Sequence, residues 1–499
     1  MSKNKPALSQ YVLLPARGLR AVGAQQSVFV NELNSDIRAK GMRAFGTVGK
    51  LARPSLRVVA QINEDKAKLL EMTPENALAM RTQLPGARLI PVRYYQTAVA
   101  PMPTVAQAAK SAAAGPALKI TLTFVSKQDG KPVPGATVVA FTNFTQRIGA
   151  QGTTNSQGKV SLSLGGSSVM LQRLYVYPPQ NCWGLLKRNV TVTSGDQFTL
   201  RSISFPFVDV LAQFYGAGAA TDGSGVTVGV IDTGSGPHPD LVIAGGENTV
   251  PGELPTDFHD NGDRHGTHVA GIIAARGNAP TGRTGVAPGA TVMSFRVFGK
   301  GAHGASNFAI AKAIDRAIST DCDLINMSLG GGDPDEAIQS AIADARAAGM
   351  AVIVAAGNDD HSPVSFPASD ARAIAVSAMG RKGTFPMEST ESGDVAKPFA
   401  TTDPKNFIAA FSNIGSEIDV TGTGVGIVST VPGGYANMSG TSMACPAVTG
   451  FAARLLARNP QILGMPRDQS RSDAIIQLLL GSAKLLGFGA DFEGHGLPK

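Results

Sequence analysis

An aspartate, a histidine and a serine each lie beside glycine residues in three separate segments of the sequence. Asp232 lies in VIDTG, His265 in HGTHVAG and Ser442 in SGTSMA. A serine hydroxyl becomes a nucleophile when a histidine removes its proton and a carboxylate holds that histidine in the right tautomer. Neighbouring glycines let a substrate backbone approach closely. Together the segments predict an acyl-enzyme on Ser442.

The order Asp, His, Ser differs from the order in unrelated folds that use the same three groups. With spacings of 33 and 177 residues, the segments resemble those of the subtilisin-like (subtilase) serine peptidases. The resemblance covers residues 204–499 and implies a serine endopeptidase. In that interpretation Asp232 orients His265, which acts as base and then as acid towards Ser442.

The resemblance also assigns neighbouring residues. It makes Asn358 the oxyanion donor, paired with the backbone N–H of Ser442. It selects His265 over His268, which we expect to be structural. Cys445 is a rival nucleophile, but its surroundings match a buried helix position.

The resemblance also implies where the substrate binds. The segment that begins SLG at residue 328 resembles the strand edge of the subtilases to which a peptide adds as an extra strand. The AAG segment before Asn358 suggests an open pocket for a sizeable apolar side chain. The candidate substrate-binding residues are Ser328, Leu329, Gly330, Ala355, Ala356 and Gly357.

Continuous apolar runs alternate with helical patterns in this part of the chain. Such alternation predicts an α/β fold with a doubly wound, mostly parallel sheet, which holds its ligands at the carboxyl ends of the strands. Asp232 and Asn358 both follow such runs. The expected strands are 226–231, 291–297, 323–328 and 351–356, and the expected helices are 306–318 and 335–346.

Residues 1–96 have the pattern of a small α+β region. We expect strands at 11–14, 56–62 and 87–95 and a helix at 63–72, capped by Asn63. This pattern resembles the subtilase propeptide, which implies a self-inhibited zymogen. An Ala/Pro-rich linker follows at 97–116, where we expect the chain to be cut.

Residues 117–202 alternate apolar and polar positions between turn signals, which predicts a β-sandwich. The run from Pro132 to Val160 resembles carboxypeptidase-regulatory-like or Ig-like modules, and we expect a role in spacing or protein contact. Within the catalytic domain, 203–499, residues 380–407 look like an insertion, either a loop near the cleft or a partner-binding element.

Charge and composition limit the partners. The net charge is +7, and residues 1–60 carry ten Lys and Arg against one Glu and one Asp. Such an arm could bind nucleic acid or an acidic membrane. Without a nucleic-acid motif we favour a solvated, removable segment, and we expect no nucleic-acid partner.

No apolar run is long enough for a membrane span, and no secretory signal opens the sequence. We therefore expect a cytoplasmic protein or one exported by a non-classical route. The three cysteines, Cys182, Cys322 and Cys445, are too few for a disulfide framework. We expect no cofactor, although a structural calcium ion is compatible with the resemblance.

The expected partners are protein or peptide substrates and the chain's own N-terminal domain as an intramolecular inhibitor. Two alternatives stay open at this point. One is a dedicated processing peptidase or transpeptidase for one partner substrate. The other is a non-catalytic binding protein on the same fold, which the intact Asp232, His265, Ser442 and Asn358 disfavour.

Overall fold

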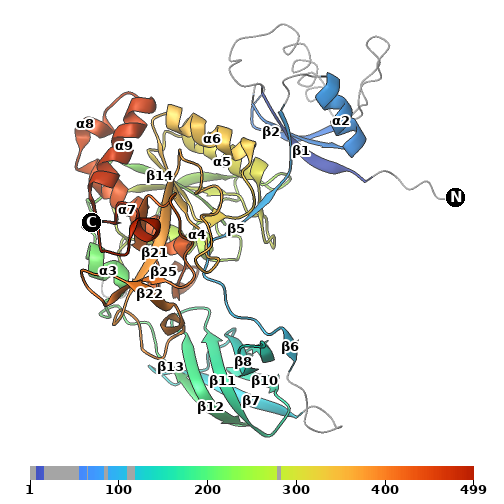
Figure 1. Cartoon of the computed structure of the whole chain (residues 1–499), viewed down its shortest axis with the longest axis vertical. Helices are drawn as coiled ribbons and strands as arrows, with labels where there is room; N and C mark the ends of the chain where they lie inside the picture. Colours follow the sequence, from blue (N-terminus) through green and yellow to red (C-terminus); the bar gives the residue numbers. More distant parts are fainter. Residues whose placement is uncertain (1–6, 16–55, 64–65, 84–87, 109–117, 278–281) are drawn as a thin grey trace, which may run out of the picture.

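A computed structural model describes residues 7–15, 56–63, 66–83, 88–108, 118–277 and 282–499. Most of the basic residues counted above lie outside these ranges. Figure 1 shows an N-terminal sheet, a β-sandwich and a large α/β part. No described helix has the length and apolarity that a membrane span requires. The domain boundaries expected from the sequence stay predictions.

A mostly parallel sheet forms the centre of the α/β part and confirms the expected fold class. The strands β15, β16, β14, β18, β20 and β21 are parallel to one another, and β24 adds to β21 in parallel. They span Ile243–Asn248, Thr291–Arg296, Thr227–Asp232, Leu324–Met327, Ala351–Ala355, Ile374–Arg381 and Val420–Thr423.

Helices cover both faces of this sheet (Figure 1). Side chains alternate along a strand, so Val230 of β14 joins the core on one face and Ile231 joins the core on the other. The first core contains α4 (His265–Ala274) and α7 (Thr441–Ala457). The second contains α5 (Asn307–Ser319) and α6 (Glu336–Ala347).

The N-terminal sheet corrects one expectation. Its order is β2 (Leu56–Gln61), β3 (Lys68–Met72), β1 (Ser9–Leu14) and β4 (Arg88–Pro91). The predicted helix at 63–72 is wrong, because residues 68–72 pair antiparallel with both β1 and β2. The helix α2 instead begins at Pro74, which suits a first helical turn, and extends to Gln83.

The strand expected at 87–95 is divided in two. Pro91 ends β4, and after a short gap β5 (Tyr94–Thr97) enters a different sheet. There it lies between β17 (Ala305–Ser306) and β19 (Leu329–Gly330), antiparallel to both. The chain therefore passes from the N-terminal sheet directly into the α/β part.

The predicted β-sandwich consists of two sheets that share one apolar core. One sheet has the order β10 (Lys159–Ser163), β7 (Lys119–Ser126), β13 (Gln197–Leu200). The other has the order β12 (Leu185–Thr193), β11 (Ser168–Tyr177), β8 (Thr137–Asn143), β9 (Ile148–Thr153), β6 (Gln107–Ala108).

The β-sandwich is packed against the α/β part. Trp183 is 1% exposed and belongs to the same core cluster as α4 and α7. The expected insertion at 380–407 supplies the facing surface, since Glu388 O accepts from Leu186 N at 2.7 Å. This insertion contains a 3-10 helix (Thr390–Gly393) and β22 (Val395–Phe399), which pairs with β23 (Asn406–Ala409) beside β21.

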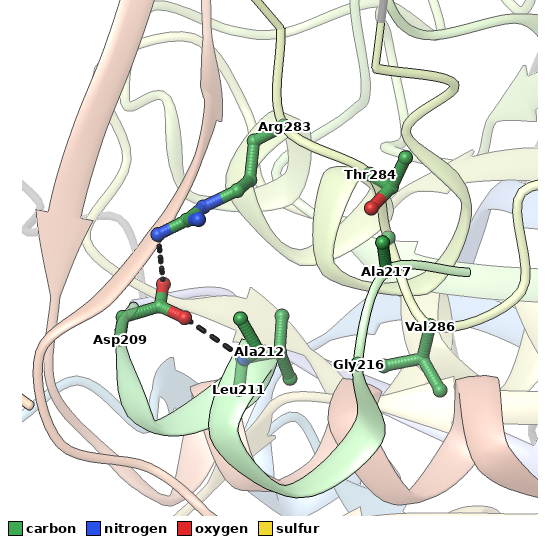
Figure 2. Close-up of a pocket in the computed structure, with 9 residues that line it drawn as sticks. Asp209, Leu211, Ala212, Gly216, Ala217, Arg283, Thr284 and Val286 are labelled. Atoms are coloured by element: carbon green, nitrogen blue, oxygen red, sulfur yellow. Dashed lines mark hydrogen bonds and ion pairs between the residues drawn. The ribbon is translucent and has the colours of Figure 1, made fainter. Parts of the chain in front are cut away.

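A short helix, α3 (Val210–Tyr215), follows the sandwich and borders a small pocket (Figure 2). Figure 2 shows Arg283 reaching across to Asp209, whose carboxylate lies 3.1 Å away and also caps the helix at Ala212 N. None of the predicted site residues lines this pocket. The pair formed by Asp209 and Arg283 links the start of α3 to the segment that contains Arg283.

Further elements complete the α/β part. A hairpin of β25 and β26 packs on α4. After α7 the chain forms short elements and one longer helix, α9. The bounds of the hairpin strands and of these last elements are β25 (Ile427–Val431), β26 (Gly434–Met438), α8 (Pro460–Leu463), α9 (Gln469–Gly481), β27 (Ala483–Lys484), α10 (Ala490–Glu493) and β28 (Leu497–Pro498).

Candidate active site

Asp232 and His265 form the buried half of the site. Asp232 is the last residue of β14 and His265 the first of α4, and each is 1% exposed. His265 Nδ1 lies 2.7 Å from Asp232 Oδ1. A carboxylate accepts the proton on Nδ1, which leaves Nε2 with a lone pair. Among the described residues Nε2 has no hydrogen-bond partner, so it is available as a base.

The electrostatics of His265 suit a base held next to a carboxylate. Burial disfavours the imidazolium, but the Asp232 charge and its hydrogen bond outweigh that cost, with smaller contributions from Asp263 and Asp260. The net effect raises the pKa of His265 above its usual value. The imidazolium that forms when a serine loses its proton is therefore stabilised.

Ser442 is the second residue of α7, next to the helix N-terminus. Its Oγ donates to Ser328 O at 2.9 Å rather than to His265. Its backbone N–H donates to Ala98 O at 3.0 Å. The structure thus contains the contact between Asp232 and His265, and the Ser442 hydroxyl is bonded to the Ser328 carbonyl.

Asn358 contacts Thr441, the residue before Ser442. Its Oδ1 accepts from Thr441 N at 2.9 Å and from Thr441 Oγ1 at 3.0 Å, which fixes the orientation of the amide. Its Nδ2 is buried and has no partner among the described residues. A buried donor without a partner is costly unless a ligand completes it. A developing oxyanion would supply that partner.

The chain's own β5 occupies the expected substrate edge. Thr97 and Gln96 pair with Leu329 and Gly330, as the strand-addition prediction requires of a peptide. The next residue, Ala98, donates its N–H to Ser328 O at 3.1 Å. Beyond it, Ala100 N donates to Ser439 O at 2.9 Å. An extended segment therefore crosses the site on both sides of Ser442.

Two glycines are required by close approaches here. A Cβ on Gly440 would lie 2.6 Å from Ala98 O, and its φ is 153°. A Cβ on Gly357 would lie 2.4 Å from Asn413 Nδ2, and its φ is 108°. Ala355 and Ala356 precede Gly357 and are buried, one in each of the two cores.

Sequence reasoning missed Ala98, Ser439 and Thr441 as parts of the site. Ala98 lies inside the Ala/Pro-rich segment in which we expected a cut, but composition alone could not select its register. The pocket was expected to take a sizeable apolar side chain, whereas the residue before Val99 here is an alanine. The large buried side chain of this segment is Tyr95, three residues before Ala98. It is 1% exposed, and its ring centroid lies 6.0 Å from that of Phe366.

The rival residues have other partners. His268 Nε2 lies 3.0 Å from Ala436 O and 3.1 Å from Ile427 O, and burial lowers its pKa to about 3. Cys445 is fully buried with Sγ 3.2 Å from Asn326 Oδ1, and burial raises the pKa of its thiol. A thiol held neutral and away from the cleft is a poor nucleophile.

The part of the chain that the structure describes contains no cluster of side chains suited to binding a calcium ion. No group of three or more His, Cys, Asp or Glu residues gathers there in a way that could hold a metal ion. The structural calcium ion considered from the sequence therefore stays a prediction without a site.

The α/β part is similar in sequence to known proteins. Residues 223–496 match the model of the Subtilase family. Subtilisin BL of Lederbergia lenta is 38% identical over 269 residues, which are 54% of this chain and 88% of that protein. An alkaline protease of Alkalihalobacillus alcalophilus is 38% identical over 269 residues, 54% of this chain and 63% of that protein. Subtilisin E of Bacillus subtilis is 40% identical over 244 residues, which are 48% of this chain and 57% of that protein. The family match leaves residues 1–222 uncovered.

Proposed function

Because this chain belongs to the subtilase family and is a serine endopeptidase, we propose that Ser442 is its nucleophile, His265 its base and Asp232 the group that orients the base. The contact of 2.7 Å between His265 Nδ1 and Asp232 Oδ1 carries this assignment. It explains why Nε2 keeps a lone pair, and among the described residues this atom has no hydrogen-bond partner.

The reaction begins when the Ser442 hydroxyl turns from Ser328 O to His265 Nε2. Oγ bonds to the substrate carbonyl carbon as its proton passes to His265. Ser442 N and Asn358 Nδ2 stabilise the oxyanion. His265 then protonates the leaving amine as the C–N bond breaks, and water releases the acyl group from Ser442 by the reverse proton transfers.

We also propose that the N-terminal region inhibits the enzyme in the uncut chain. One face of its sheet packs on Phe308 and Ala311 of α5 and Ala337 of α6. Arg88 and Arg93 lie 3.5 Å and 3.7 Å from Glu336 and Asp333 at the rim. Exposed ion pairs of this kind contribute about 0–1 kcal/mol, so apolar burial accounts for most of the docking.

The bond cut during maturation is Ala98–Val99 in this proposal. The Ala98 carbonyl accepts the hydrogen bond from Ser442 N, which is where the carbonyl of a scissile bond must lie. Residues on both sides are held by backbone hydrogen bonds, as in a bound peptide. The segment expected from the sequence, 97–116, contains this bond.

The test compares the wild type with Ser442→Ala, using Cys445→Ala as the matched control. We expect the wild type and Cys445→Ala to shorten to a chain that begins at Val99 and to hydrolyse an unstructured protein. Ser442→Ala should stay at full length and be inactive. Intact mass and N-terminal sequencing provide the readout. Shortening of Ser442→Ala in the absence of other proteases, or inactivity confined to Cys445→Ala, would refute the assignment.

A further inference from the structure

The segment after the cut bond is fastened at its far end. Val105 N donates to Gln151 Oε1 at 3.0 Å, and Ala106 N donates to Arg147 O at 3.0 Å. Gln107 then pairs with Ile148 as β6 joins the five-stranded sheet. Figure 1 shows this stretch running from the α/β part to the β-sandwich.

The side chains strengthen this attachment. Val105 packs against the apolar cluster on the outer face of the same sheet, where Phe141, Tyr175 and Leu186 are buried. The attachment therefore combines a strand pairing, a side-chain hydrogen bond and apolar contact. None of these contacts involves residues 1–98, so removal of the N-terminal region leaves them in place.

The anchor itself is fixed relative to the active site. Besides Trp183, the β-sandwich contributes Asn181, whose N–H donates to Tyr435 O at 2.7 Å. Arg264, which precedes the catalytic His265, donates from Nη1 to Pro179 O. Lys187 Nζ lies 2.6 Å from Glu388 Oε1. The point at which residue 106 is held cannot move far from the cleft while these contacts persist.

We propose that, once the chain is cut, residues 99–106 remain as a tethered occupant of the leaving-group half of the cleft. This inference rests on the proposed cut at Ala98–Val99. Val99 and Ala106 are seven positions apart in the sequence, so the new amino terminus stays within about 25 Å of its anchor. A short tether of this kind gives an effective concentration on the order of millimolar.

The consequence is selective. The tethered segment competes with substrate residues that follow the scissile bond, because Ala100 N binds Ser439 O on that side. It leaves the β17–β19 side, vacated by β5, open to the residues that precede the bond. Substrates with a short leaving group therefore avoid the competition, whereas substrates extended beyond the scissile bond encounter it.

The test uses the full chain with residues 101–104 replaced by the recognition sequence of an unrelated site-specific protease. After maturation, that protease releases the segment from the same molecules. We expect KM for an internally quenched peptide, extended on both sides of its scissile bond, to fall several-fold on release. The rate for a peptide anilide with the same preceding residues should change less than twofold. A scrambled 101–104 replacement, treated identically, is the control.

A synthetic peptide of residues 99–106, added to the released enzyme, should inhibit the extended substrate at millimolar concentration. An unchanged KM, or equal changes for both substrates, overturns the inference. N-terminal sequencing before release separates the two proposals. If no chain begins at Val99, the proposed cut itself fails. If chains begin at Val99 and KM does not respond, only the tethered occupant is refuted.

Discussion

The backbone N–H of Ser442 donates a hydrogen bond of 3.0 Å to the carbonyl oxygen of Ala98. The two residues are 344 positions apart in the sequence, and β5 holds them together by pairing with β17 and β19. This contact fixes the register of the chain in the cleft. It selects one peptide bond among those of the Ala/Pro-rich segment.

That register can be tested at the residue after the bond. In Val99→Pro the leaving nitrogen becomes a tertiary amide in a ring, which strains the geometry needed for C–N cleavage. We expect the chain to stay uncut, whereas Val99→Ala should be processed normally. Intact mass over time measures both. Normal shortening of Val99→Pro at the same bond would contradict the register.

The roles of the two polar side-chain atoms of Asn358 can be tested independently. Asn358→Asp keeps the oxygen that accepts from Thr441 but lacks the Nδ2 donor. We expect both Asn358→Asp and Asn358→Ala to lower kcat by at least about 10²-fold. KM should change far less, because the donor acts on charge that develops in the transition state. Full activity of Asn358→Asp would instead assign Asn358 to holding Thr441.

The pH dependence follows from His265. Only neutral His265 accepts the Ser442 proton, so kcat/KM should fall as the pH drops through its pKa. Because Asp232 raises that pKa, the inflection should lie above 6.5. Asp232→Asn removes the charge, so the inflection should move to lower pH and kcat should fall by about 10⁴-fold. An inflection that stays in place in Asp232→Asn would argue against this pair.

Docking of the N-terminal sheet can be tested at Phe308, which is fully buried under that sheet. Phe308→Ala should weaken the association of residues 1–98 with the cut enzyme by about 2 kcal/mol or more. The fraction of the N-terminal fragment that co-elutes after the cut measures this. Leu78 of α2 is 64% exposed, so Leu78→Ala is the matched control. Equal loss of co-elution in both variants would count against docking through Phe308.

Local sequence patterns were enough to predict those helices and strands whose structure depends mainly on their own residues. The apolar runs that became β14, β18 and β20 and the periodic runs that became α5 and α6 were predicted near their observed bounds. The motifs around Asp232 and His265 likewise identified two side chains that lie 2.7 Å apart, and the third motif identified Ser442, the second residue of α7.

Tertiary pairing decided the rest. Residues 68–72 carry helix-forming side chains, yet pairing with two neighbouring strands made them β3. The contact of Ala98 with Ser442 depends on how the N-terminal sheet docks, which no local window contains. The insertion at 380–407 was assigned to the cleft or to a partner, and it faces the β-sandwich of the same chain.

Trp183 limits how the protein can be shortened in the laboratory. Its ring fills space between Phe207, at 5.5 Å between ring centroids, and Gly426, while its backbone belongs to the sandwich. A truncated enzyme that begins at residue 203 would lose this ring and expose to water the apolar surface that it covers, including Phe207. Exposing apolar surface costs free energy in proportion to its area. Recombinant versions intended for crystallisation or engineering should therefore begin before the sandwich, even though the family match starts only at residue 223.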